Sequence, residues 1–125
     1  ERRNGKAKLD DGVLQRRAQR HNLAYFDGVL RWTSIRWVTN QNGRHGSCTP
    51  STGTIRISHR LAKMPSFVLD YVIIHELAHL IEANHSADFW ALVDRYPRTE
   101  RARGYLMAVG MENIDFDNVD EDIES

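Results

Sequence analysis

The chain has 125 residues, the size of one domain, and apolar residues make up 41% of it, which is enough for a hydrophobic core. Its single cysteine, Cys48, excludes an intrachain disulfide, and no apolar run is long enough to span a membrane. The charged N-terminus lacks the apolar segment of a signal peptide. These features predict a cytoplasmic protein with no membrane partner.

The charges are unevenly distributed along the chain, although the formal net charge is zero. Residues 1–60 contain 12 basic and 4 acidic residues, a net charge of +8. Residues 61–125 contain 5 basic and 13 acidic residues, a net charge of −8, and seven of these acids lie in residues 112–125. We therefore divide the chain into a domain over residues 1–110 and an acidic C-terminal tail over residues 111–125.

A first helix with a basic face is predicted near the N-terminus. Asp10 or Asp11 can cap this helix, and the turn signal Asp27-Gly28 follows it. Three basic residues lie on its exposed side, namely Arg16, Arg17 and Arg20. Such a stripe can hold phosphates without reading sequence, so DNA is a predicted partner of the basic N-terminal half.

The following residues predict a small sheet. Residues 34–39 have strand spacing, in which Ile35, Trp37 and Thr39 share one face. Ile55 and Ile57 share a face over 54–58, and a short strand is predicted over 44–48. Asn42-Gly43 is a strong hairpin signal, and residues 50–53 form a second turn. We therefore predict three antiparallel strands.

Three further helices are predicted in the C-terminal half. A long helix with Ser66 as its N-cap is apolar nearly all round and ends at Asn84, so it should be buried on several sides. Ser86 caps the next helix, and Thr99 caps a last helix that stops at Gly110. Helices around one small sheet define an α+β fold.

The predicted long helix contains an H-E-x-x-H motif, formed by His75, Glu76 and His79. Histidines four residues apart lie on one helical face, one turn apart, so both imidazoles can reach one metal ion. Neutral imidazole suits Zn²⁺. Glu76 flanks that face and can reach a water on the metal without being a ligand itself.

Two residues compete to be the third ligand that a catalytic zinc requires. His85 lies six residues after His79, and it can reach the metal if the helix ends near Asn84 and the chain turns back. Glu82 lies on the same face as His75 but about 10 Å further along an unbroken helix, which is too far for a ligand. We predict His85 as the ligand and keep Glu82 as the alternative.

Two segments carry a family resemblance, GSCTPSTGTIRISHRLAKMPSFVLDYVI and DYVIIHELAHLIEANHSADFWALVDRY. They resemble the YgjP-like metallopeptidases, which are zincins related to the SprT and WLM groups, over about residues 44–106. The resemblance implies a zincin-like fold, in which a small antiparallel sheet packs on an active-site helix and its neighbours. It also implies zinc ligands at His75, His79 and His85, with Glu76 as general base.

The combined prediction is a zinc-dependent metallopeptidase, a hydrolase whose substrate is a protein or peptide. The peptide would add as an extended strand along the sheet edge over 44–48, where Arg44 and His45 are candidate substrate-binding residues. A nucleic-acid-associated module with a non-peptidase zinc site is the alternative. The basic first half favours it, and the intact Glu76 counts against it.

Overall fold

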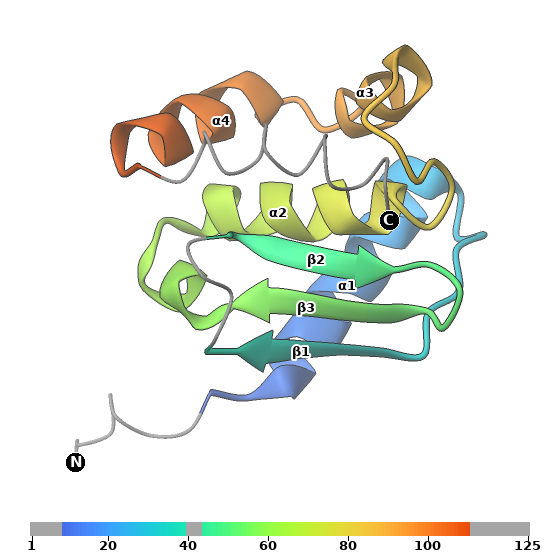
Figure 1. Cartoon of the computed structure of the whole chain (residues 1–125), viewed down its shortest axis with the longest axis horizontal. Helices are drawn as coiled ribbons and strands as arrows, with labels where there is room; N and C mark the ends of the chain where they lie inside the picture. Colours follow the sequence, from blue (N-terminus) through green and yellow to red (C-terminus); the bar gives the residue numbers. More distant parts are fainter. Residues whose placement is uncertain (1–8, 40–43, 111–125) are drawn as a thin grey trace.

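A computed structural model describes residues 9–39 and 44–110, which form an α+β domain as predicted (Figure 1). In Figure 1, α1 lies behind the sheet, and α2 lies between the sheet and the pair formed by α3 and α4. None of the described helices is long and apolar enough to cross a membrane. In chain order the elements are α1 (Asp11–Phe26), β1 (Ser34–Val38), β2 (Gly46–Thr49), β3 (Thr54–Ser58), the 3₁₀-helix η1 (His59–Lys63), α2 (Ser66–Ala78), α3 (Ala87–Val93) and α4 (Thr99–Ala108).

The sheet is mixed, so the prediction of a purely antiparallel sheet was wrong. The strand order is β1-β3-β2, and β3 pairs antiparallel with β2 but parallel with β1. The turn over 50–53 joins β2 to β3 as expected, whereas β1 and β2 are not neighbours and form no hairpin. Asn42-Gly43 lies outside the described residues. Alternation fixes which face of a strand is buried, but it does not fix the direction of the neighbouring strand.

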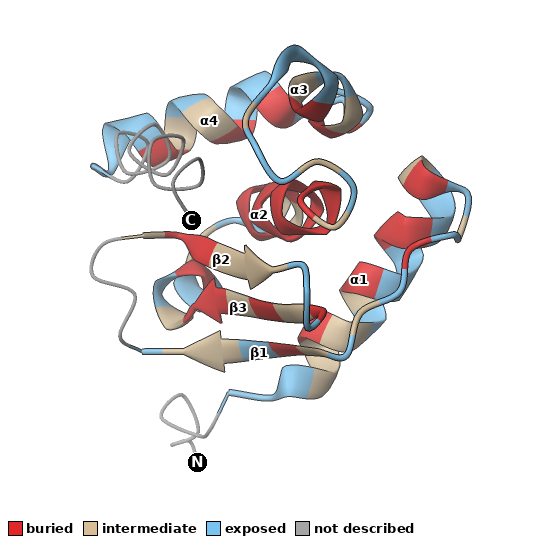
Figure 2. Cartoon of the chain, turned by 45° about the vertical axis from the view of Figure 1, so that its right-hand side comes forward, coloured by how far each residue is buried: buried red, intermediate tan, exposed pale blue. Residues whose placement is uncertain are grey.

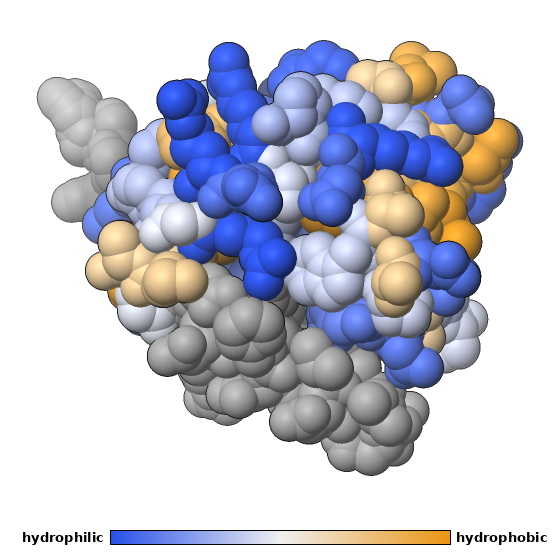
Figure 3. Space-filling model, turned by 90° about the horizontal axis from the view of Figure 1, so that it is seen from above, coloured by the Kyte–Doolittle hydropathy of each residue, from blue (hydrophilic) through white to orange (hydrophobic). Residues whose placement is uncertain are grey.

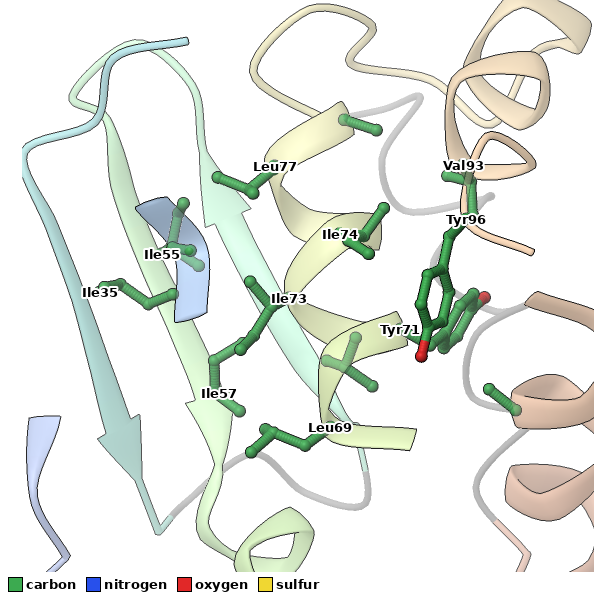
Figure 4. Packing of buried hydrophobic residues seen from close by; sticks show 14 of the residues in the cluster. Ile35, Ile55, Ile57, Leu69, Tyr71, Ile73, Ile74, Leu77, Val93 and Tyr96 are labelled. Carbon is green, nitrogen blue, oxygen red and sulfur yellow. The ribbon is translucent and has the colours of Figure 1, made fainter. Parts of the chain in front are cut away.

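β3 is the central strand of the sheet and the most deeply buried one. Ile55 and Ile57 of β3 are fully buried, and Ile35 of β1 packs beside Ile55 in the parallel register. The sheet-facing side of α2 meets these isoleucines through residues spaced four apart, namely Leu69, Ile73 and Leu77 (Figure 4). This layer is one part of a core that also takes in buried residues of α1, α3 and α4.

α2 is buried on two sides, as its apolar sequence predicted. Buried residues run along almost its whole length (Figure 2). Tyr71 and Ile74 face away from the sheet, towards Val93 and Tyr96 (Figure 4). The outer surface of α3 and α4, seen from above, is mostly hydrophilic (Figure 3). These two helices thus present their polar sides to solvent and cover the second apolar side of α2.

The helix caps agree with the sequence in part. Asp10 caps α1 and accepts a hydrogen bond from the backbone N–H of Gly12 at 2.7 Å. Ser86 caps α3. Ser66 and Thr99 are not N-caps, because each is already the first helical residue. The Thr99 hydroxyl is instead buried and donates to backbone carbonyls at the end of α3.

A half-buried carboxylate, that of Asp70, joins α1 to α2. Arg17 donates to Asp70 Oδ1 at 2.6 Å, and His21 Nε2 lies 2.9 Å from the same oxygen. Burial acts to raise the pKa of Asp70, but the hydrogen bonds and charges of His21 and Arg17 together outweigh it. The pKa of Asp70 therefore lies below its ordinary value of 3.8.

Replacing Asp70 by Asn is expected to destabilise the fold by about 1–3 kcal/mol at neutral pH, because hydrogen bonds to a charged group are lost. A lowered folded-state pKa means that the carboxylate stabilises the fold above pH 3.8 and that this contribution is lost as the pH falls further. The gap between the wild type and Asp70→Asn should therefore shrink below that pH.

Urea unfolding at neutral and acidic pH measures this gap. Asp94→Asn, which changes an exposed carboxylate, is the matched control and should shift the free energy of unfolding by less than about 0.5 kcal/mol. A gap that stays constant down to strongly acidic pH would contradict the assignment.

Candidate metal centre

α2 ends earlier than predicted, and its end forms part of the site. The helix stops at Ala78 with His79 as its C-cap, so the predicted continuation to Asn84 was wrong. Residues 81–84 are largely exposed, and without an apolar face to bury, the helix is not extended. The chain instead reverses, and His85 comes back to the helix end.

Three histidine side chains meet at this helix end. Candidate ligand atoms of His75, His79 and His85 all lie within 4.8 Å of one another. His75 and His79 are buried, His85 is half-buried, and His85 Nε2 lies 3.3 Å from His75 Nε2. Three imidazoles with one open position are a donor set of catalytic zinc sites, so the residues present fit zinc. Among the described residues, the group of candidate ligands consists of these three histidines, and Glu82 is not part of it.

The structure also orients two of these rings. His79 Nδ1 lies 3.0 Å from the backbone carbonyl of Glu82, and His75 Nδ1 lies 3.3 Å from the hydroxyl of Tyr71. A partner on Nδ1 leaves Nε2 with a lone pair for a metal. Glu82 thus helps to orient the His79 ring through its backbone carbonyl and not through its side chain. Tyr71 was not predicted as a site residue, although its position four residues before His75 was a usable signal.

An aromatic wall supports the histidines from α3. Phe89 is fully buried, and its ring centroid lies 4.9 Å from His75, 4.4 Å from His79 and 4.9 Å from His85. Trp90 packs against two of the same rings, and Arg103 stacks over it at 4.4 Å. Phe89 and Trp90 are both in α3, and their apolar pattern alone does not show that the surface they cover consists of histidines.

Glu76 lies beside this group and is 1% exposed. Its Oε2 atom is 3.8 Å from His45 Nδ1. His45 was predicted as a candidate substrate-binding residue at the sheet edge, but it is fully buried and its ring lies 5.0 Å from that of His75. Arg44 is half-buried and precedes β2, which begins at Gly46, two residues later than predicted.

The structure is thus an α+β domain with a candidate metal centre at the end of its central helix. The chain belongs to the YgjP-like metallopeptidase domain family, whose model matches residues 9–108. The structure is similar to the crystal structure of the metallopeptidase zymogen of Pyrococcus abyssi abylysin, with a TM-score of 0.67 and 20% sequence identity. The similarity covers 78% of this chain and 94% of that chain, and it shows a shared fold. A search of curated proteins found no significant match.

Replacing His85 by Ala is expected to lower zinc affinity by more than about 100-fold, since even an outer partner of a zinc ligand contributes about 10–100-fold. Glu82→Ala should leave zinc affinity nearly unchanged, because the contact to His79 uses the Glu82 backbone. Competition against a chromogenic chelator measures both affinities. If Glu82→Ala lost zinc and His85→Ala kept it, Glu82 would be the third ligand.

Proposed function

We propose that the protein is a zinc-dependent peptidase, with His75, His79 and His85 as zinc ligands and Glu76 as general base. The observation that carries the proposal is the convergence of three histidine nitrogens within 4.8 Å, next to a buried carboxylate. Membership of a metallopeptidase family supports the same reaction class. The similar abylysin structure is itself that of a metallopeptidase zymogen.

The proposed reaction divides the work between the metal and one side chain. Zinc supplies Lewis-acid chemistry, which polarises the scissile carbonyl and lowers the pKa of water towards about 7. Glu76 accepts a proton from the attacking water as the new C–O bond forms. It then delivers that proton to the amine nitrogen as the C–N bond breaks, so the products are one carboxyl group and one amine. The burial of Glu76 keeps bulk water away from this proton transfer.

The two outer strands of the sheet are not equivalent as places for a substrate. On β1, the backbone N–H of Trp37 donates to Asp11 Oδ1 at 2.9 Å, and its indole N–H donates to the Asp10 carbonyl at 3.2 Å. The start of α1 therefore occupies that edge. On β2, Gly46 lies directly against Glu76. We therefore place an extended peptide along β2, bound by main-chain hydrogen bonds, with Arg44 as a candidate contact.

Cleavage of casein, a largely unfolded protein, tests the proposed function. The zinc-loaded protein should cut casein, lose this activity in 1,10-phenanthroline and regain it when zinc is added back. Absence of cleavage by zinc-loaded protein, or cleavage that ignores the chelator, would contradict the proposal.

Fewer arginines of α1 are available to nucleic acid than the sequence suggested. Arg16 and Arg20 are exposed on α1, but Arg17 is bound to Asp70. The remaining basic residues before the helix, at 1–8, lie outside the described residues. DNA binding stays a prediction, and we expect it to fall steeply with salt if these arginines hold phosphates.

A further inference from the structure

The residue before β2 and the first residue of β2 lie close to the buried carboxylate of Glu76, and neither belongs to the histidine trio. His45 is fully buried, and its Nδ1 atom lies 3.8 Å from Glu76 Oε2. The ring of His45 also meets those of His75 and Tyr71 edge to face, with centroids 5.0 and 6.5 Å apart. His45 is therefore close to both the proposed base and the first histidine of the trio.

Gly46 forms the second side of this contact. A Cβ atom at this position would lie 3.2 Å from Glu76 Oε2 and 3.4 Å from Glu76 Cγ. It would also lie 2.8 Å from the backbone carbonyl oxygen of Arg56, which is closer than real Cβ atoms come. The Glu76 carboxylate thus rests against bare backbone, and any side chain at position 46 would take its space.

Both residues are held by the sheet. The backbone N–H of Ser58 donates to the His45 carbonyl at 2.9 Å, and Gly46 is the register partner of Ile57 on β3. Ile57 is fully buried in the core. The backbone of both residues is therefore bonded to, or in register with, the central strand β3.

We propose that His45 and Gly46 form a slot that fixes the Glu76 carboxylate in the orientation in which it accepts a proton, with His45 as a positioning residue. The inference rests on the proposed function, because it assigns a role to the surroundings of its base. A glutamate side chain has several rotatable bonds, and a general base works only within hydrogen-bond reach of its proton donor. The His45 ring, whose Nδ1 atom lies 3.8 Å from Glu76 Oε2, and the Gly46 backbone restrict that freedom from two sides.

Two replacements of His45 separate its polar role from its shape. His45→Phe keeps a ring and removes the N–H, whereas His45→Gln keeps an N–H donor. We expect His45→Phe to lower kcat at least about tenfold with KM changed less than about twofold, and His45→Gln to recover at least about threefold of that loss. Zinc affinity should stay within about threefold of the wild type in both variants.

His59→Phe is the matched control. It also replaces a histidine by phenylalanine, but the His59 ring contacts the Val38 carbonyl at the C-terminal end of β1 and is not part of the histidine trio. Its kcat and zinc affinity should equal those of the wild type. An unchanged kcat in His45→Phe would overturn the proposal. A loss of zinc affinity beyond about 100-fold would also overturn it, because His45 would then be a ligand.

Crystal structures of the zinc-loaded wild type, His45→Phe and Gly46→Ala give a readout that needs no turnover. We expect the Glu76 carboxylate to lie against Gly46 in the wild type and to rotate away in both variants. If the wild type does not cleave casein, the proposed function fails, while the slot is still judged by these structures. An unmoved Glu76 in His45→Phe would overturn the slot even if Gly46→Ala did not fold.

Discussion

Replacing Glu76 by Gln is expected to lower kcat for casein cleavage by about 10²–10⁴-fold while zinc stays bound, since this is the usual contribution of a general base. Glutamine has nearly the same shape as glutamate and fits beside Gly46, but its amide cannot accept the proton from water. The carboxylate is outside the histidine trio, so the ligand set is unchanged. Steady-state kinetics and the zinc content of the purified variant measure the two effects.

Glu82→Gln is the control for this experiment, because it makes the same chemical change in a half-buried glutamate whose backbone is its contact to the site. Its kcat should match that of the wild type. If Glu76→Gln loses its zinc, Glu76 has a structural role in the metal site. If Glu76→Gln turns over casein normally, the base lies elsewhere.

Replacing His75 by Ala is expected to remove zinc and also to destabilise the domain. His75 is fully buried, and its ring packs against Phe89 at 4.9 Å and against His79 at 5.1 Å. Removing a buried ring leaves a cavity and typically lowers the free energy of unfolding by about 3–5 kcal/mol. Loss of zinc adds a second contribution, because a ligand that binds only the folded state stabilises it.

Unfolding measurements with and without a chelator separate these two contributions. The difference between the wild type and His75→Ala in the chelator reports the cavity alone, and the larger difference in zinc reports both. His59→Ala, a change outside the trio, should bind zinc like the wild type. Equal zinc content and equal stability of His75→Ala and the wild type would contradict the proposed centre.

The sequence predicted those parts of the fold that depend on local patterns. The spacing of Ile55 and Ile57 predicted a strand with one buried face, and Ser86 predicted the start of α3, because both signals act within a few residues. The direction of β1 could not be predicted in this way. The parallel pairing of Ile35 with Ile55 depends on how the whole strand packs, and the same alternation suits either direction.

In the candidate site too, the local features could be predicted and the features that depend on tertiary packing could not. The four-residue spacing of His75 and His79 follows from the helical repeat, and a chain reversal before His85 was the condition under which it could join them. His45 could not be identified in this way. It is 30 residues from His75 in the chain, and only the packing of α2 against the β2 side of the sheet brings it to Glu76. A lone histidine near a predicted turn carries no signal of such a contact.

The central position of β3 has a consequence for the way this chain folds. Cys48 and Ile55 are seven residues apart in the chain, so β2 and β3 can meet by closing a short loop at little entropic cost. Ile35 and Ile55 are 20 residues apart, and all of β2 lies in the segment between them. A parallel pair also needs a crossing connection and not a tight turn. The β2–β3 hairpin is therefore expected to form first and to act as the template for β1, so that the strand made earliest during synthesis is the last to join the sheet.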